Sequence, residues 1–197
     1  MKQGWVEKKL GDVCDIFNGA TPLRGQKEYW EGGVINWFTV KDIRQQGRTI
    51  NHTDQKISQL GFDNTSIKLL PARSVLLCCT ASVGEYAITN IELTTNQQFN
   101  GLVVKNSDQL LPEYLFHFSS TLKSILLSVS GKTTIDFVSM TKLKNVEISI
   151  PPLEEQKQIV AKLDQCFEAI DKARANAVKN LENAKELFQS KLNDIFS

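Results

Sequence analysis

Side chains suited to contacts with nucleic acid gather in a few turn-rich segments of the sequence. Segment 19–27 combines glycine, threonine and proline with two cations, and segment 130–134 is small and polar with one lysine. Lysine and arginine neutralise phosphates, while arginine, glutamine, asparagine and threonine contact base edges. The same composition occurs in solvated loops that bind nothing, so the residues alone leave both interpretations open. The candidate contact residues are Thr21, Arg24, Lys27, Lys41, Arg44, Lys132, Thr133 and Thr134.

Residue patterns that could perform catalysis are scarce. The sequence contains no G-x-x-x-x-G-K-[ST] or G-x-G-x-x-G phosphate loop, and no N-P-P-[YF] tetrapeptide of the type that holds a flipped base for methylation. Cys78 or Cys79 could serve as a nucleophile with His117 as its base. Both cysteines, however, lie in an apolar run typical of a buried strand, where thiols are inert. We therefore expect no catalytic residue in this chain.

Cysteine and histidine usage argues against a metal site. The sequence has two histidines, and its cysteines show no C-x-x-C spacing. We expect the thiols to be reduced and buried, as in a cytosolic protein. No apolar stretch approaches the roughly 20 residues that span a bilayer, and no secretion signal follows Met1, so we expect a cytoplasmic protein without a membrane partner. The four cysteines are Cys14, Cys78, Cys79 and Cys166.

The composition is that of a globular protein with little net charge. Hydrophobic residues make up 41% of the 197 residues, and 23 lysines and arginines against 22 acidic residues leave a formal charge of +1. A protein that holds nucleic acid by bulk charge is normally far more basic. Residues 1–150 carry 16 cationic and 14 acidic side chains, and residues 151–197 carry 7 and 8. Nucleic-acid binding by this chain alone should therefore be weak.

A change in composition at Pro151 and Pro152 indicates a boundary between two parts, residues 1–150 and 151–197. The second part contains no glycine and, after Pro152, no proline. Two prolines followed by Glu154 and Glu155 form a favourable helix start, because acidic side chains lie at the positive end of the helix dipole. The pattern predicts one helix that continues to the end of the chain, roughly 65 Å long.

This helix carries an apolar seam at alternating spacings of three and four, which is typical of a coiled coil. Arg174 and Lys191 interrupt the seam, and a charged seam residue specifies register and partner at some cost in stability. A helix folded back on its own domain remains the alternative, but the predicted length favours an arm that pairs with another helix. The seam residues are Val160, Leu163, Phe167, Ile170, Arg174, Ala177, Leu181, Ala184, Phe188 and Ile195.

The first 150 residues mix strand and helix patterns without regular alternation. Residues 111–129 carry an amphipathic helical pattern that begins at Pro112. Because strands and helices do not alternate, we predict an α+β class: a mixed globular domain followed by one long C-terminal coiled-coil helix. Short apolar runs bounded by turn residues predict strands at 34–40, 74–79, 85–89, 101–104 and 146–150.

Several motifs, in order along nearly the whole chain, resemble the specificity subunit of type I restriction-modification systems. The segment 148–160, I-S-I-P-P-L-E-E-Q-K-Q-I-V, is the most specific, because it resembles the start of that family's conserved helical region. In segment 70–76, Arg73 stands where glycine is common. The other matching segments are W-V-E-K-K-L-G-D-V at 5–13, G-A-T-P at 19–22, Y-W-E-G-G-V-I-N-W at 29–37, L-P-A-R-S-V-L at 70–76, S-V-G at 82–84 and N-Q-Q at 96–98.

The resemblance implies a target-recognition domain in residues 1–150 that reads a few base pairs of double-stranded DNA. It implies that the helical arm docks a methyltransferase subunit and, through the complex, a restriction subunit. Adenine methylation and cleavage would then belong to those partners, together with S-adenosylmethionine, ATP and Mg²⁺, so the chain itself is expected to bind no cofactor.

The sequence matches one half of the usual specificity subunit, with one recognition domain and one conserved helical region. A single recognition domain with an unpaired seam suggests a homodimer through the arm, which would read a symmetric, interrupted target. The alternative is a truncated interaction module that binds methyltransferase subunits through its coiled coil and has no useful DNA affinity.

Overall fold

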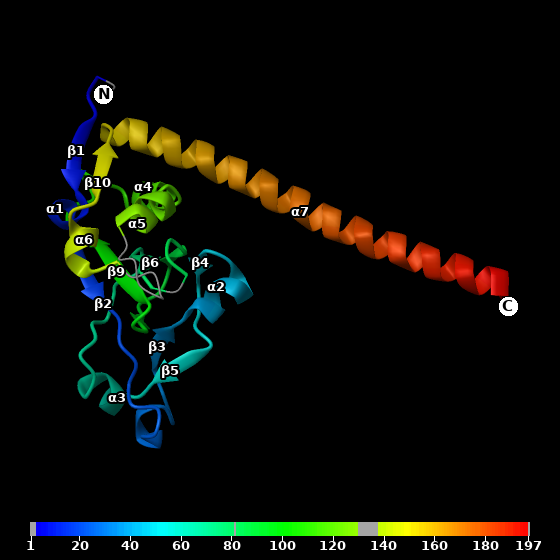
Figure 1. Cartoon of the computed structure of the whole chain (residues 1–197), viewed down its shortest axis with the longest axis horizontal. Helices are drawn as coiled ribbons and strands as arrows, with labels where there is room; N and C mark the ends of the chain where they lie inside the picture. Colours follow the sequence, from blue (N-terminus) through cyan, green and yellow to red (C-terminus); the bar gives the residue numbers. More distant parts are fainter. Residues whose placement is uncertain (1–2, 81, 130–137, 197) are drawn as a thin grey trace. The chain divides into compact units, whose positions relative to one another are not determined.

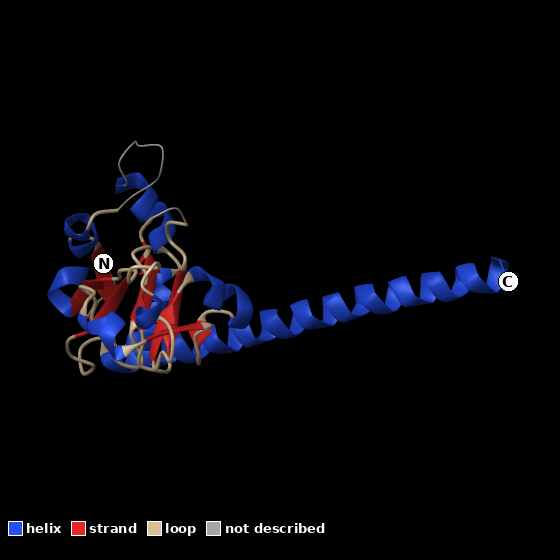
Figure 2. Cartoon of the chain, turned by 90° about the horizontal axis from the view of Figure 1, so that it is seen from below, coloured by secondary structure: helices blue, strands red, loops and turns tan. Residues whose placement is uncertain are grey.

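The chain separates into two compact units, residues 1–157 and 158–197. The computed structural model in Figure 1 describes residues 3–80, 82–129 and 138–196. Within the described residues, the first unit contains three small sheets and several short helices, and the strands lie in this unit (Figure 2). Mixed sheets and helices followed by a long helix confirm the predicted α+β class.

The largest sheet has five strands in the order β2-β9-β6-β7-β4. Its pairs are antiparallel except β4 with β7, which is parallel. The central strand β6 is buried along its whole length, as its uninterrupted apolar run predicts. The strands are β2 (Cys14–Asn18), β4 (Thr49–Ile50), β6 (Val75–Cys78), β7 (Tyr86–Thr89) and β9 (Phe99–Val104).

A second sheet has three strands in the order β5-β3-β8. Its central strand, β3, contributes to the core of the first sheet. Successive side chains of a strand point to opposite faces of the sheet, so neighbouring residues of β3 pack into two different cores. Phe38 packs edge-on against Phe99 of β9, with ring centroids 4.9 Å apart, in the main core. Trp37 instead packs with Ile57 and Ile67 in a smaller cluster. The strands are β3 (Ile35–Phe38), β5 (Gln55–Ile57) and β8 (Thr94–Thr95).

The third sheet joins both ends of the first unit, because β1 (Val6–Lys9) pairs antiparallel with β10 (Glu147–Ile150). All five strands expected from apolar runs are present, with slightly different bounds. The short strands β1, β2, β4, β5 and β8 were not predicted. They are short or polar, and their partners are distant in the sequence, so local patterns hold little trace of them.

The helices of the first unit are short, and several have capping side chains. Thr39 begins α2 by accepting a hydrogen bond from Lys41 N, while the Asp42 carboxylate accepts one from Thr39 N. Ser58 and Ser139 cap α3 and α6 in a similar way. The helices are α1 (Leu10–Val13), η1 (Lys27–Tyr29), α2 (Val40–Gln46), α3 (Gln59–Asp63), α4 (Pro112–Ser119), α5 (Leu122–Val129) and α6 (Met140–Lys144).

The prediction of one helix over 111–129 was wrong, since the chain forms two helices, α4 and α5, in this region. At the break, the Ser120 and Thr121 hydroxyls donate to the carbonyls of His117 and Phe118, at 2.7 and 2.8 Å. The backbone N–H groups of Ser120 and Thr121 bond to the same carbonyls in three-residue steps. These bonds replace the four-residue steps of an α-helix and end α4.

The long helix α7 (Leu153–Phe196) begins in the first unit, where its first turn is held by buried polar contacts. The fully buried Gln156 donates through Nε2 to the carbonyls of Gln109 and Pro151 and accepts through Oε1 from Leu111 N, at 2.8 to 2.9 Å. Trp5 Nε1 donates to the neighbouring Glu155 carboxylate at 3.0 Å. The helix start is therefore part of the folded domain.

The second unit consists of the rest of α7. The 44 residues of α7 give the whole helix a length of about 66 Å. No helix among the described residues is both long enough and apolar enough to cross a membrane.

Candidate nucleic-acid interface

The loop 19–26 carries Arg24, whose guanidinium lies against two indole rings. Its central carbon is 3.7 Å from the centroid of Trp30 and 4.7 Å from that of Trp37. The two indoles meet edge to face, with centroids 5.0 Å apart. An arginine on an aromatic face gains about 0.5–1 kcal/mol at an exposed site, so the side chain has a preferred position.

Hydrogen bonds from both indoles hold this loop. Trp30 Nε1 donates to the Leu23 carbonyl at 3.2 Å, and Trp37 Nε1 donates to the Ala20 carbonyl at 3.1 Å. Arg24 Nη1 donates to Gln55 Oε1 at 2.7 Å. Because Gln55 on β5 lies opposite Trp37 on β3, one sheet supplies both Trp37 and the amide, whereas Trp30 follows η1.

Thr21 and Lys27 belong to the same region as Arg24. The Thr21 hydroxyl is hydrogen-bonded to the Gln97 side chain, which connects the loop to the amide-rich segment after β8. Lys27 begins the short helix η1 and is exposed. The structure therefore brings three of the predicted contact residues into one loop region.

The other two described candidates, Lys41 and Arg44, lie on α2. Lys41 Nζ forms an ion pair with the Asp54 carboxylate at 2.7 Å, and this hydrogen bond raises the pKa of Lys41 above its ordinary value. The buried Asp42 accepts a hydrogen bond from Asp54 N at 2.7 Å, which holds the partner of Lys41 in place. The Lys41 charge is thus balanced within the chain, whereas Arg44 is exposed in the last turn.

Two consecutive residues connect the Arg24 loop with helix α2, because Asp54 binds Lys41 and Gln55 binds Arg24. Sequence reasoning missed both supporting residues. Neither belongs to a motif, and their contacts with Lys41 and Arg24 span 13 and 31 positions. The predicted contact residues Lys132, Thr133 and Thr134 lie outside the described residues.

Three of the four cysteines are buried as expected, in the sheet region of the first unit. Burial raises the pKa of Cys14 to about 12 and that of Cys79 to about 11, and it also raises the pKa of Cys78, so these thiols stay protonated and inert. The prediction for Cys166 was wrong: it lies on α7 and is exposed. No cluster of His, Cys, Asp or Glu suited to a metal ion occurs in the described parts of the chain.

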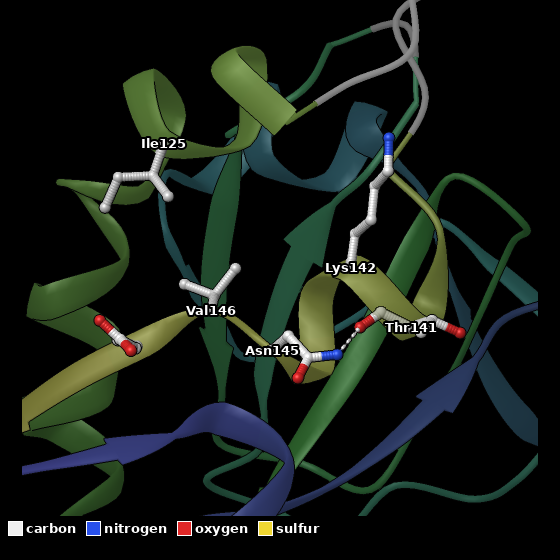
Figure 3. A pocket seen from close by; sticks show the side chains of 6 residues that line it. Ile125, Thr141, Lys142, Asn145 and Val146 are labelled. Atoms are coloured by element: carbon white, nitrogen blue, oxygen red, sulfur yellow. Dashed lines mark hydrogen bonds between the residues drawn. The ribbon is translucent and has the colours of Figure 1, made fainter.

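A cavity of about 590 Å³ lies between α5, α6 and the start of β10 (Figure 3). Asn145 Nδ2 donates to the Thr141 carbonyl at 2.8 Å at its edge. Among the described contact candidates none lines this cavity, so it is separate from the Arg24 loop. Its lining residues are Ile125, Thr141, Lys142, Asn145, Val146 and Glu147.

The apolar seam of α7 is exposed along most of its length. Val160 and Leu163 are half-buried, and the seam positions from Phe167 onward are exposed. Leu181 and Phe188 are 58% and 66% exposed, which is unusual for large apolar side chains in a regular pattern. A seam of this kind is suited to contact with a second helix.

A globular unit of small mixed sheets followed by a long helix with an exposed apolar seam defines an α+β domain with a helical arm. The chain belongs to the family of type I restriction modification DNA specificity domains, whose family model matches residues 2–180. Membership confirms the resemblance to type I specificity subunits found in the sequence.

Two relatives place the chain within this family. It is 34% identical over 191 residues to the type I restriction enzyme MjaIX specificity subunit of Methanocaldococcus jannaschii, covering 94% of this chain and 43% of that protein. It is 30% identical over 168 residues to the EcoprrI specificity subunit of Escherichia coli, covering 84% and 41%. The chain therefore spans less than half the length of these relatives.

Solved structures agree with these sequence relatives. The HsdS subunit of Thermoanaerobacter tengcongensis matches with a TM-score of 0.67 and 26% identity, covering 87% of this chain and 39% of that one. A chain from a structure on complex assembly and conformational transition of the type I R-M system matches with a TM-score of 0.71 and 28% identity, covering 93% and 44%.

Proposed function

We propose that the chain is a DNA sequence-specificity component that recognises one half-site of a bipartite target. The observation that carries this proposal is the family match over residues 2–180, which includes the globular unit and more than half of the arm. The exposed Arg24 loop and the neighbouring helix α2 provide cations and amides on the globular unit. The half-site proposal rests on the extent of the match, because the matched region makes up 43% and 41% of the two relatives.

Partner subunits supply the chemistry in this proposal. A type I methyltransferase subunit docks on the arm and transfers the methyl group of S-adenosylmethionine to adenine, and a restriction subunit that uses ATP and Mg²⁺ joins through the complex. The complex acts in the cytoplasm. The chain selects the DNA sequence and performs no chemistry itself in this proposal. The inert thiols of the globular unit are consistent with that role.

The chain forms a homodimer through α7 in this proposal. Two copies related by a two-fold axis pair their seams in opposite directions and carry one recognition domain each. Such a dimer reads a symmetric, interrupted sequence whose half-sites lie about one helical turn apart on one face of the DNA. The support is the regular row of exposed apolar side chains, among them Phe167, Leu181 and Phe188.

Methylome mapping tests this function directly. Cells that hold the methyltransferase subunit are compared with and without this gene. We expect a symmetric, interrupted motif of methylated adenine that is present only when the gene is present. An unchanged methylome would contradict the proposal, provided that both proteins are produced and co-purify.

A second candidate is an interaction module that binds methyltransferase subunits and has no useful DNA affinity. The pairing of Lys41 with Asp54 and the net charge of +1 favour it, because few cations remain to release counterions from DNA. This module would bind its partner tightly and add no salt-sensitive DNA binding to it. The recognition component, in contrast, binds DNA weakly alone and tightly with the methyltransferase subunit.

A further inference from the structure

We propose that Arg24 is a specificity-determining residue that reads a guanine in the major groove of double-stranded DNA. This inference rests on the proposed function, because it assigns a base to the recognition domain. The geometry points to Arg24 because its guanidinium is held by an indole ring and a side-chain amide while its side chain remains exposed.

Two contacts define the position of the guanidinium plane. The central carbon of the guanidinium lies 3.7 Å over the Trp30 ring, and Nη1 donates to Gln55 Oε1 at 2.7 Å. Two contacts of different direction leave one favoured orientation. A guanidinium fixed in this way loses little further freedom when it meets a ligand, so its remaining hydrogen bonds are selective in direction.

The backbone beneath Arg24 is held as firmly as the side chain. The indole N–H groups of Trp30 and Trp37 bond to the carbonyls of Leu23 and Ala20, on the same loop. Trp37 is 2% exposed and belongs to a buried cluster, so the loop is connected to the core and not only to the surface. A site supported by packed residues keeps the geometry that base recognition requires.

Arg24 differs from Lys41 and Arg73 in its partners. Lys41 is paired with Asp54 and Arg73 with Glu113, so both charges are balanced by carboxylates. Within the described part of the chain, Arg24 has no ion pair, and the one hydrogen bond of its side chain goes to a neutral amide. Its full charge and most of its five N–H donors therefore remain for a ligand.

A planar pair of donors matches the two acceptors that guanine presents in the major groove, O6 and N7. Phosphate also accepts two hydrogen bonds from arginine, but its oxygens can be approached from many directions and require no fixed plane. The braced orientation therefore favours the base edge. A phosphate contact is the competing outcome of the test.

The experiment uses the full chain in complex with its methyltransferase subunit. The preferred target is first selected from random duplexes, and each guanine in it is then replaced by 7-deazaguanine, which lacks the N7 acceptor. We expect one guanine in each half-site at which the replacement weakens binding about 5- to 150-fold. The variant Arg24→Lys keeps the charge but lacks the planar fork, so this penalty should disappear.

Two further variants separate base reading from general effects. Gln55→Met keeps the stack on Trp30 and removes the in-plane brace, so it should reduce the preference for that guanine while Arg24 is unchanged. Lys27→Ala removes an exposed cation of the same region and should weaken matched and mismatched duplexes equally. Tryptophan fluorescence of each variant checks that the indole pair is intact.

Other results would overturn the inference. If Arg24→Lys retains the guanine preference but weakens every duplex and lowers the salt slope by about one, Arg24 is a phosphate contact. If neither Arg24→Lys nor Gln55→Met changes binding, the loop does not touch DNA. If the wild-type complex selects no sequence at all, the proposed function fails as well, which distinguishes that failure from the first two.

Discussion

At the scale of single residues, the backbone at Arg73 shows how one side chain contributes in two opposite ways. Its φ of 68° lies in the left-handed region. Glycine adopts this region readily and asparagine and aspartate do so occasionally, but it is unfavourable for other residues. The side chain forms a two-pronged ion pair with Glu113, at 2.8 and 2.5 Å, which connects the turn before β6 to α4. The exposed pair contributes about 0.2–1 kcal/mol and so offsets only part of the backbone cost, which is about 1–2 kcal/mol.

The two effects at Arg73 can be separated by substitution. Arg73→Ala removes the ion pair and keeps the backbone strain, whereas Arg73→Gly removes both. We expect the glycine variant to be more stable than the alanine variant by about 1 kcal/mol in urea unfolding. Equal stabilities, or a more stable alanine variant, would show that the turn carries no strain.

The cysteines lead to a prediction about reactivity. At pH 8, an alkylating reagent should modify Cys166 in the native protein and leave Cys14, Cys78 and Cys79 unmodified, because burial raises the pKa of these three thiols. Peptide mass spectrometry measures the sites, and all four cysteines should react in denaturant. Rapid native modification of Cys14 or Cys79 would contradict the burial.

The same thiols make stability depend on alkaline pH. Their pKa values are higher in the folded chain than the ordinary value of 9.0, so the unfolded chain loses these protons first. The stability that they contribute is fully present below pH 9 and falls as pH rises toward about 11 to 12. Cys14→Ala should flatten this fall in urea unfolding measured between pH 8 and 11, and an equally steep fall in the variant would contradict the prediction.

At the scale of elements, the start of α7 depends on one buried amide. Gln156 satisfies two carbonyls and one N–H from the segments before α4 and α7. Apolar residues could fill the same space but would leave those groups without partners in a buried environment. The helix start is thus integrated into the domain by hydrogen bonds and not by its apolar seam.

Replacement of this amide should destabilise the globular unit. We expect Gln156→Leu to lower the free energy of unfolding by about 3 kcal/mol, because a leucine leaves Leu111 N and two carbonyls unsatisfied. The matched control is Gln158→Leu, two residues further along the helix and exposed, which should change it by less than about 0.5 kcal/mol. Similar losses in both variants would mean that Gln156 is not a specific anchor.

At the scale of the whole molecule, the exposed seam of α7 leads to a prediction about assembly. A charge at a seam position should dissociate the proposed dimer, because a coiled coil buries its seam residues. Phe167→Asp and Leu181→Asp should each shift the mass measured by light scattering at micromolar concentration from dimer toward monomer. Gln165→Asp adds the same charge on the far side of the helix and should leave the dimer intact. A wild-type monomer, with or without the methyltransferase subunit, would contradict the dimer.

Local patterns of the sequence were sufficient for the features that repeat over short distances. The absence of glycine and the seam spacing predicted α7 within a residue of its end, and apolar runs located β6 and β7. The motifs at 5–13 and 148–160 were sufficient for the family. Such features are visible because each follows from the chemistry of residues that are neighbours along the chain.

Only the tertiary structure decided the partners of the individual side chains. It separated α4 from α5, exposed Cys166, paired Lys41 with Asp54 and placed Arg24 between Trp30 and Gln55. The contact between Arg24 and Gln55 joins a loop to a strand 31 positions away, and no short pattern encodes it. The sequence by itself therefore determined the family and the long helix. Which partner each charged side chain has was decided by folding, because an ion pair or a ring contact requires two groups that are distant in the sequence to lie close together in space.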